Sequence, residues 1–384
     1  MAVRALSDDE VLALRTRAQR FTGARGGGSA PDVAEVVAAV VGVQAQAVAP
    51  ARLGVRVRST GLTVAAVVQA CAVERSVVRT WTLRGTLHLV GADDIGWLVG
   101  LLGPASAARD ARRRTELGLD DGLVERALHA LPDVLAGGAL TRAELVRALA
   151  ASGVAVPADG QAPAHLVAYA AMHGLLCYGP DREDGEPTFV LLASWLGRTA
   201  PPMAPDEALA NLARRYLAGH GPAGATDLAA WAGIPLGRAR RGLELVRGEL
   251  EEVRVGRDPA WLPAGAAAAA PDAPGRGAEA GCGGPVVRLL PAFDGYLLGY
   301  RTRAAILAPA WARRVHPGGG WINPTLLVDG RIAGTWRQQR GGSALTVVVA
   351  PFARLDAAVL PGLEAEVADV GRFLGAPTRL VVAE

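Results

Sequence analysis

One order of elements recurs along this chain: two helices joined by a short turn, then a pair of strands. It is clearest from Thr141, where Thr141-Arg142-Ala143-Glu144 forms a capping box that predicts a helix through Ala150. We expect the rest of this unit to follow in order, with a second helix at about 165–173 and strands at 175–178 and 188–192. Helix, turn, helix and hairpin is the layout of a winged helix.

The same order is expected on both sides of this unit. Before it, Ser7-Asp8-Asp9-Glu10 is a second capping box, and the following spacing predicts helices at 7–19, 33–41 and 63–72 and a hairpin at 77–90. The alternating segment Arg52–Arg58 fits either a strand or the tail of a helix. After it, we expect helices at 209–218, 226–231 and 236–247 and a wing strand at 252–255.

The last hundred residues change to a β-rich pattern. We expect strands at 286–290, 325–328, 331–336, 344–349 and 379–382, with a helix at about 357–374 before the final strand. A chain of 384 residues exceeds what one core organises. The predicted modules are 1–130, 131–205 and 206–262, then a mobile low-complexity linker at 263–284 and a β-rich domain at 285–384. The fold class is α+β.

Composition removes several classes of protein. The three cysteines, Cys71, Cys177 and Cys282, form no Cys-x-x-Cys pair, and the six histidines lack ligand spacing, so we expect no disulfide framework, metal site or cofactor. No long apolar run lacks charge, and the N-terminus has no apolar signal core, which favours a soluble cytoplasmic protein. The chain contains no lysine, which excludes a Gly-x-x-x-x-Gly-Lys phosphate loop.

Arginine is concentrated in one part of the chain. Residues 52–114 contain ten arginines and four acids, although the whole chain has a net charge of only +3. Arg52, Arg56 and Arg58 begin this segment. It predicts either a basic face that contacts a polyanion or a solvated surface that acids from elsewhere balance.

Gln44 and Gln46 are polar residues in an otherwise apolar run, Val40 to Ala47. If this segment is extended, both amides point to the same side. Two amides at that spacing can hold a water molecule and a sugar or base edge together. The alternative is an ordinary polar face at the end of a helix or strand.

The stretch Arg79 to Val90 combines cations with a tryptophan and a histidine. Arg79 and Arg84 could grip phosphates, and His88 could donate a hydrogen bond to a phosphate or base. The alternative is a wing whose Trp81 fills the core while the arginines face solvent.

Two later segments have a similar composition. Pro291 to Arg301 combines aromatic residues with one acid and one arginine, and either lines a groove or packs between modules. Trp336 to Gly342 predicts a hairpin tip with two arginines and two glutamines, which either probes a DNA groove or is a solvated turn.

Together these segments resemble one family. GVQAQ, RTWTLRGTLHLV, LLPAFDGYLLGYR and PTLLVDGRIAGTWR occur in the order typical of bacterial winged-helix DNA glycosylases of the AlkZ and YcaQ (AlkX) type, over about 7–374. The resemblance implies three tandem winged helices and a C-terminal barrel-like β-domain around a concave DNA-binding face. It also implies hydrolysis of the N-glycosidic bond of alkylated purines, chiefly N7-alkylguanine, and unhooking of interstrand crosslinks, in base excision repair or in antibiotic self-resistance.

The resemblance also assigns residues. Gln44 and Gln46 match the Gln-x-Gln motif of AlkZ-like members and are the expected catalytic pair. The residues expected to contact double-stranded DNA are Arg52, Arg56, Arg58, Arg79, Trp81, Arg84, Thr86, His88, Tyr300, Arg301, Arg337, Gln339 and Arg340. Two departures affect the aspartate-tyrosine block, because Gly295 and Thr302 stand where the family usually has acids.

The pair of amides also suggests a mechanism. An amide is no general base, but an N7-alkylguanine already carries a positive charge and leaves as a neutral base. Positioning of water by Gln44 and Gln46 would then suffice. Without lysine, Schiff-base lyase chemistry has only the N-terminal amine, so we expect a monofunctional enzyme. The resemblance implies a monomer. The alternative function is a winged-helix DNA-binding protein without activity.

Overall fold

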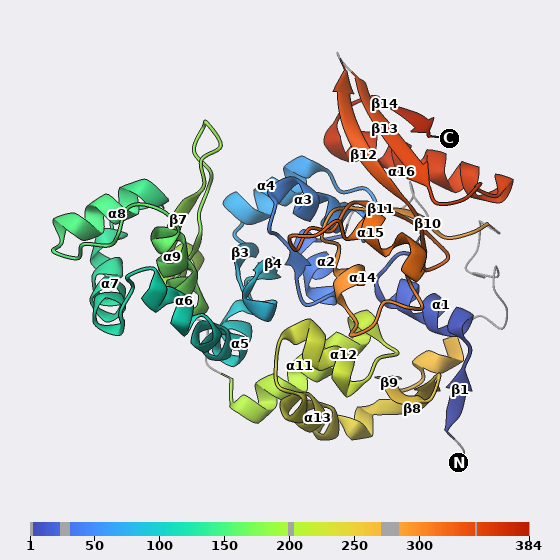
Figure 1. The fold of residues 1–384 in the computed structure, drawn as a ribbon, viewed down its shortest axis with the longest axis horizontal. Coiled ribbons are helices and arrows are strands. Elements are labelled where there is room, and N and C mark those ends of the chain that lie inside the picture. Colours follow the sequence, from blue (N-terminus) through green and yellow to red (C-terminus); the bar gives the residue numbers. More distant parts are fainter. Residues whose placement is uncertain (1–2, 24–30, 199–202, 270–283, 342–343, 384) are drawn as a thin grey trace. The chain divides into compact units, whose positions relative to one another are not determined.

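The computed structural model describes residues 3–23, 31–198, 203–269, 284–341 and 344–383. The chain forms two compact units. Unit 1 contains Met1–Val67, Leu209–Trp231 and Pro235–Glu384, and unit 2 contains Val68–Ala208 and Ala232–Ile234. Figure 1 shows the order of the elements along the chain. The module borders expected at 130, 205 and 262 stay predictions.

Local sequence signals produce the first helices of unit 1. Helix α1 begins after Ser7, and the Ser7 and Glu10 side chains each accept a hydrogen bond from the other's backbone N–H, which confirms the capping box. The Asp32 side chain caps α2 by accepting one hydrogen bond from the backbone N–H of Ala34. The N-terminal elements of unit 1 are β1 (Arg4–Leu6), α1 (Asp8–Ala18), α2 (Val33–Ala39), β2 (Val43–Gln44), α3 (Val48–Arg56) and the start of α4 (Val64–Ala72).

The segment Arg52–Arg58 is mostly helical. Helix α3 ends at Arg56, and both arginines at its end are buried. The alternation of arginine and valine therefore does not mark a half-exposed strand. The arginines can be buried at these positions because each is paired with a buried carboxylate.

The last of the three expected helix-and-hairpin segments is also present and lies mostly in unit 1. It contains α11 (Pro205–His220), α12 (Ala225–Ala232), α13 (Leu236–Leu245), β8 (Leu250–Val255) and β9 (Asp258–Pro263). Strand β1 extends this hairpin as a parallel third strand beside β8. Leu6, Val11, Leu14, Val253 and Leu262 form the core between them. Of the expected linker, Pro263 ends β9 and Ala266–Ala269 form a short helix, η3, while 270–283 lie outside the described residues.

The C-terminal part of unit 1 is a five-stranded sheet in the order β10, β11, β12, β13, β14. Its elements are β10 (Val287–Leu290), α14 (Gly295–Leu298), α15 (Ala312–Val315), β11 (Thr325–Val328), β12 (Arg331–Gly341), β13 (Ala344–Pro351), α16 (Leu360–Leu374) and β14 (Thr378–Val382). Strands β10 to β13 are antiparallel and β14 is parallel to β13. Within the described residues this sheet has two ends, β10 and β14, so the expected barrel is instead an open sheet beside α16 (Figure 1).

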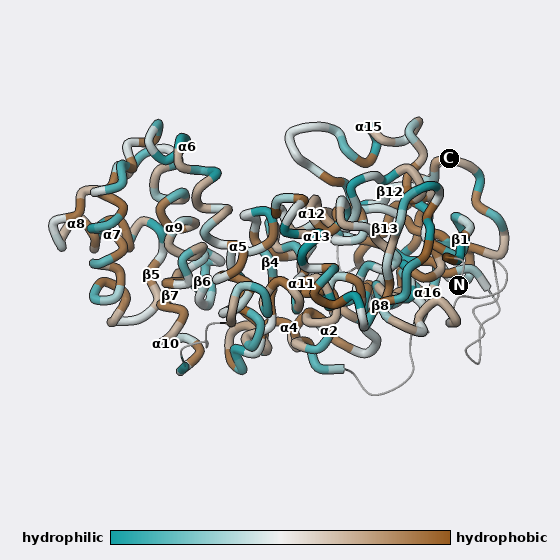
Figure 2. Tube along the Cα trace, turned by 90° about the horizontal axis from the view of Figure 1, so that it is seen from below, coloured by the Kyte–Doolittle hydropathy of each residue, from teal (hydrophilic) through white to brown (hydrophobic). Residues whose placement is uncertain are grey.

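Unit 2 contains two hairpins and a group of helices. Its elements are β3 (Val77–Trp81), β4 (Leu87–Gly91), α5 (Ile95–Arg109), α6 (Ala111–Glu116), α7 (Asp121–Val134), β5 (Leu140–Thr141), α8 (Arg142–Ala151), α9 (Ala162–Met172), β6 (Leu176–Tyr178), β7 (Thr188–Leu191) and α10 (Leu192–Leu196). Strands β3 and β4 form the hairpin expected at 77–90, and the capping box of Thr141 and Glu144 begins α8. Figure 2 shows alternating hydrophilic and hydrophobic stretches along α7 and α8.

The core of unit 2 lies between these helices. Leu131, Leu149, Ala170 and Leu176 are completely buried there. Helices α5 and α9 approach closely at Gly103, where any Cβ would clash with the Met172 carbonyl oxygen. Sequence analysis missed α5, which is apolar on almost all sides and therefore lacks the amphipathic pattern of a surface helix.

Candidate active site

The two glutamines lie in unit 1 where a short strand leads into a helix. Gln44 ends β2 and is 9% exposed, whereas Gln46 lies in the following bend and is exposed. Helix α3 begins two residues after Gln46, at Val48. Strand β2 thus includes Gln44 but not Gln46, and the two residues differ in their access to solvent.

Close packing fixes α3 against β2. A Cβ on Gly54 of α3 would lie 2.7 Å from the Cγ1 atom of Val43, so only glycine permits this approach. Val43 immediately precedes Gln44. The position of the first glutamine therefore depends on how α3 packs.

Buried ion pairs hold the C-terminal end of α3. Arg58 donates to both carboxylate oxygens of Asp294 at 2.8 Å, and it also donates to Gln19 Oε1 and the carbonyl of Gly54. Asp294 in turn accepts from the backbone N–H of Tyr296 and caps α14. Removing one partner from a buried pair of this kind costs about 3–5 kcal/mol.

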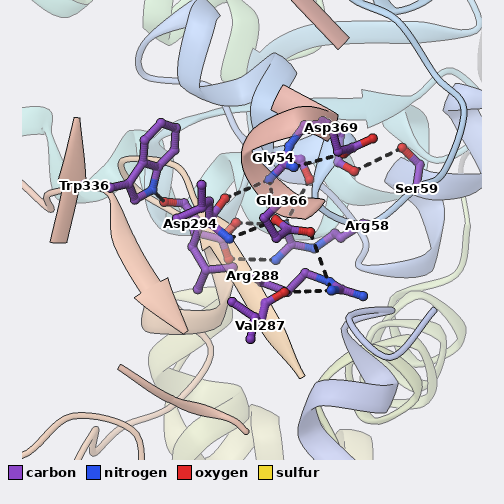
Figure 3. Close-up of polar contacts among 12 residues, drawn as sticks. Gly54, Arg58, Ser59, Val287, Arg288, Asp294, Trp336, Glu366 and Asp369 are labelled. Carbon is purple, nitrogen blue, oxygen red and sulfur yellow. Dashed lines mark hydrogen bonds and ion pairs between the residues drawn. The ribbon is translucent and has the colours of Figure 1, made fainter. Parts of the chain in front are cut away.

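Arg56 makes a second set of contacts with α16. Its guanidinium group is completely buried, 3.0 Å from Asp369 and 3.1 Å from Glu366. Glu366 also accepts from the backbone N–H of Leu289 and lies 3.5 Å from Arg288. Figure 3 shows Arg58, Arg288, Asp294, Glu366 and Asp369 converging in this network.

This network corrects two predictions. Arg56 is 0% exposed and Arg58 is 3% exposed, and both are paired with carboxylates, so neither presents its charge to DNA in this structure. Sequence analysis missed their partners Glu366, Asp369 and Gln19. A signal was present, because Glu366 and Asp369 are three residues apart in an otherwise apolar helix.

A cavity of about 490 Å³ opens beside the start of α3. The first turn of α3 contributes Ala49 and Pro50 to its wall, three and four residues after Gln46. Strands β12 and β13 form the opposite wall. The complete lining is Ala49, Pro50, Leu53, Pro291, Ala292, Asn323, Pro324, Thr335, Trp336, Arg337, Gln338, Val348, Ala350 and Ala383.

The cavity wall on β12 includes part of the expected hairpin tip. Arg337, Gln339 and Arg340 are exposed, but they lie within β12 and pair with β13 instead of forming the turn. The turn itself, 342–343, lies outside the described residues. Among the described residues, neither arginine makes an ion pair, so both charges are available to an anion.

The aspartate-tyrosine block divides into a buried and an exposed part. Tyr300 is 3% exposed, its hydroxyl donates to the His220 carbonyl, and Arg15 lies 3.7 Å above its ring. The Tyr300 hydroxyl and one ring face are thus occupied inside the protein, so we do not assign Tyr300 the expected contact with DNA. Arg301 is exposed, and its backbone N–H donates to Asp227. At the departure Gly295, a Cβ would lie 3.9 Å from Arg58 Nη2.

The remaining expected DNA contacts lie on the β3–β4 hairpin of unit 2, apart from Arg52, which is half-buried on α3 of unit 1. Trp81 stacks on Tyr178 at 5.4 Å between ring centroids, and Arg79 lies 4.2 Å above the same ring. Arg84 is at the turn with a φ of 58°, and the Thr86 hydroxyl donates to the Leu83 carbonyl. Trp81 packs against the core of unit 2, as the alternative interpretation expected.

His88 is buried and electrically neutral. It is 2% exposed, and burial lowers its pKa to about 3, with Arg84 adding to the effect. Its Nδ1 lies 3.0 Å from the Thr86 carbonyl, which can only accept, so the hydrogen is on Nδ1. In this structure the His88 side chain is neither charged nor accessible, so we do not assign it the expected contact with a phosphate or base.

These features define a class of protein: a pair of glutamines beside an apolar cavity in unit 1, with exposed arginines on β12 that make no ion pair among the described residues. The sequence profile described as "DNA glycosylase AlkZ-like" matches residues 37–373, and the chain belongs to this family of DNA glycosylases. It is thus a hydrolase of N-glycosyl bonds. An interstrand DNA cross-link repair glycosylase of Streptomyces sahachiroi is 31% identical over 365 residues, covering 91% of this chain and 94% of the relative.

The solved structures give the same result. The DNA glycosylase AlkZ of Streptomyces sahachiroi is similar to this chain with a TM-score of 0.78 and 28% identity, covering 98% of this chain and all of the solved one. The expected α+β fold and family are thereby confirmed. No described helix combines the length and apolar character needed to cross a membrane.

Proposed function

We propose that this glycosylase hydrolyses the N-glycosidic bond of N7-alkylated guanine in double-stranded DNA, with Gln44 and Gln46 as its catalytic residues. The observation that carries the proposal is the chemistry of the pair: one buried and one exposed glutamine directly precede α3, and no acidic residue lines the neighbouring cavity. Amides orient water but do not remove its proton. Such a site suits a base that is already activated to leave.

Cleavage of the N-glycosidic bond makes different demands at the leaving base and at the sugar. Alkylation at N7 gives guanine a positive charge, so bond cleavage produces a neutral base and a sugar with oxocarbenium character. The attacking water needs orientation more than deprotonation, and such positioning can contribute several kcal/mol. We assign Gln44 and Gln46 to this water and to the deoxyribose.

The product should be an intact abasic site. A lyase reaction requires an amine that forms a Schiff base, and because the chain has no lysine, only the N-terminal amine remains, which we do not assign to the site. The enzyme is thus monofunctional. Treatment with borohydride during the reaction should trap no covalent complex, and efficient trapping would contradict this assignment.

The proposed partner is damaged duplex DNA, including DNA with interstrand crosslinks, the lesion named for the relative from Streptomyces sahachiroi. Contacts are assigned to Arg52, Arg79, Trp81, Arg84, Thr86, Arg301, Arg337, Gln339 and Arg340, and the helix-and-hairpin segments are proposed to be winged helices. We further propose a cytoplasmic monomer. Gel filtration with light scattering tests the oligomeric state.

The decisive experiment measures release of free base from a duplex that contains N7-methylguanine. Wild-type enzyme should release it, whereas the Gln44→Ala/Gln46→Ala variant should lose at least a hundredfold in kcat/KM and keep its affinity for the duplex. As a matched control, Gln69→Ala removes an amide that bonds only Glu74 on the surface of α4, and should cleave normally. Normal cleavage by the double variant would show that the site lies elsewhere.

A further inference from the structure

The segment of unit 1 from α14 to β11 carries positive charge without a single acid. Residues 295–328 contain no aspartate or glutamate, although the whole chain has 37 acids against 40 basic residues. The four arginines of this segment are Arg301, Arg303, Arg313 and Arg314. Within the described residues none of the four makes an ion pair, whereas the surface arginines Arg112, Arg214 and Arg331 each pair with an acid. The positive charge of this segment is therefore available to a partner that brings negative charge.

Two of these arginines are neighbours on α15 and are exposed. Figure 2 shows α15 in a loop at the margin of unit 1. The backbone carbonyl of Arg314 accepts a hydrogen bond from Asn323 Nδ2 at 2.8 Å, which ties α15 to the end of the segment. Trp311 stacks on Phe352 with ring planes 13° apart, and the Arg314 guanidinium lies 5.4 Å from the centre of the Trp311 ring. Arg313 and Arg314 are thus fixed at the surface, so that little side-chain freedom is lost when they bind an anion.

Arg303 gives a second, independent sign of an anion. It is half-buried, and its Nε donates to the Leu297 carbonyl at 2.6 Å. Burial lowers the pKa of Arg303, which is the direction expected for a cation that has lost water and has gained no carboxylate. An anion that arrives from outside would offset this cost. Phosphate suits the segment, because guanidinium groups bind phosphate oxygens in pairs.

The segment is also continuous with residues already assigned to DNA. Arg301, an assigned contact, lies near its beginning. Near its end, Asn323 lines the cavity together with Arg337, a second assigned contact. The next residue, Pro324, accepts a hydrogen bond from the backbone N–H of Trp336, which directly precedes Arg337. The arginines on α15 therefore belong to a stretch of chain that joins one proposed DNA contact to another.

We propose that Arg313 and Arg314 form a phosphate clamp, in which both guanidinium groups bind backbone phosphates of duplex DNA away from the damaged nucleotide. Each phosphate that an arginine neutralises releases counterions, so the clamp adds affinity that depends on salt. Contacts of this kind fix the position of the duplex without reading its bases. The clamp should therefore bind undamaged duplex as well. This inference rests on the proposed function, and it adds a binding surface that the assigned contacts do not include.

The test measures the affinity for a labelled, undamaged duplex at several salt concentrations by fluorescence anisotropy. Arg313→Gln/Arg314→Gln should reduce the magnitude of the slope of log K against log salt concentration by up to about 1.8, or about 0.9 for each contact. Arg313→Lys/Arg314→Lys keeps both charges and should keep most of the wild-type slope, although the paired hydrogen bonds are lost.

The matched control is Arg214→Gln/Arg331→Gln. It also removes two positive charges from the surface of unit 1, but these arginines are paired with Glu249 and Asp9. The control should keep the wild-type slope. Thermal unfolding of each variant shows that it is folded.

A wild-type slope in Arg313→Gln/Arg314→Gln would overturn the inference. An equal reduction in Arg214→Gln/Arg331→Gln would also overturn it, because the slope would then report net charge and not a contact. Wild-type affinity that does not depend on salt has the same consequence. Release of N7-methylguanine by the wild type is measured separately: if no base is released, the proposed function fails, while the slopes with undamaged duplex still decide the inference.

Discussion

At the scale of single residues, the same side-chain type has opposite roles at different positions. Arg56 and Arg58 are in the most arginine-rich part of the chain, yet both are buried against carboxylates. Arg337 and Arg340 are exposed and make no ion pair within the described residues. Burial with a partner, and not local composition, decides which arginine can meet a phosphate.

His88 gives a pH-dependent prediction at this scale. Its pKa is lowered to about 3 in the folded protein, against about 6.5 in the unfolded chain. Between these values the unfolded state binds more protons, so the stabilising contribution is complete above pH 6.5 and is lost as the pH falls toward 3. Between pH 7 and pH 5, we expect wild type to lose about 2 kcal/mol more than His88→Gln.

Urea denaturation at the two pH values measures this difference in the free energy of unfolding. The control is His129→Gln, which removes an exposed histidine on α7 and should show the wild-type pH dependence. If His88→Gln has the same pH dependence as wild type, then His88 is not held neutral by burial.

At the scale of elements, the sequence predicted helices and hairpins correctly where the interacting groups are close together along the chain. Ser7 and Thr141 were expected to cap helices through Glu10 and Glu144, and both boxes are present because all groups lie within four residues. The hairpins β3–β4 and β6–β7 were also predicted, because each pairs two strands that follow one another in the sequence. Helix α3 was ambiguous because its arginines are paired with residues more than two hundred positions away.

The packing of α3 on β2 gives a prediction about catalysis. In Gly54→Ala, the new methyl group would meet Val43 Cγ1 at 2.7 Å and push the helix from the strand that carries Gln44. We expect kcat for N7-methylguanine release to fall about tenfold to a hundredfold, since small displacements of catalytic groups have effects of this size. Overpacking should also destabilise the fold by about 1–3 kcal/mol.

Two further variants make this prediction specific. Val43→Ala in the same chain removes the clashing methyl groups and should restore part of the lost kcat. Gly100→Ala, in α5, is the control, because a Cβ there meets nothing within 4 Å and alanine favours a helix. A Gly54→Ala enzyme with wild-type kcat would mean that α3 does not position Gln44.

At the scale of the whole molecule, the proposed DNA contacts come from both compact units. Arg79 and Arg84 belong to unit 2, whereas Arg52, Arg301, Arg337 and Arg340 belong to unit 1. Each phosphate contact releases counterions, so the slope of log K against log salt concentration counts the contacts. Replacing Arg337 and Arg340 together by alanine should reduce the magnitude of this slope by up to about 1.8.

Affinity for undamaged duplex at several salt concentrations measures the slope. Arg112→Ala is the matched control, because Arg112 is 92% exposed in its side chain but already paired with Glu116. Its slope should equal that of wild type. If the double variant at Arg337 and Arg340 also keeps the wild-type slope, β12 does not contact the DNA backbone.

The sequence by itself determined the capped helices, the hairpins, the family and the candidate pair Gln44 and Gln46, because capping, strand alternation and motif order are local properties, but it did not reveal helices α5 to α7. The tertiary structure alone decided which polar residues are occupied. Arg56 meets Glu366 and Arg58 meets Asp294 across more than two hundred residues, and His88 becomes neutral inside the fold. It also placed Trp321 next to Asn323 in the wall of an apolar cavity. Desolvation and charge pairing act between residues that only folding brings together, so no local pattern contains them.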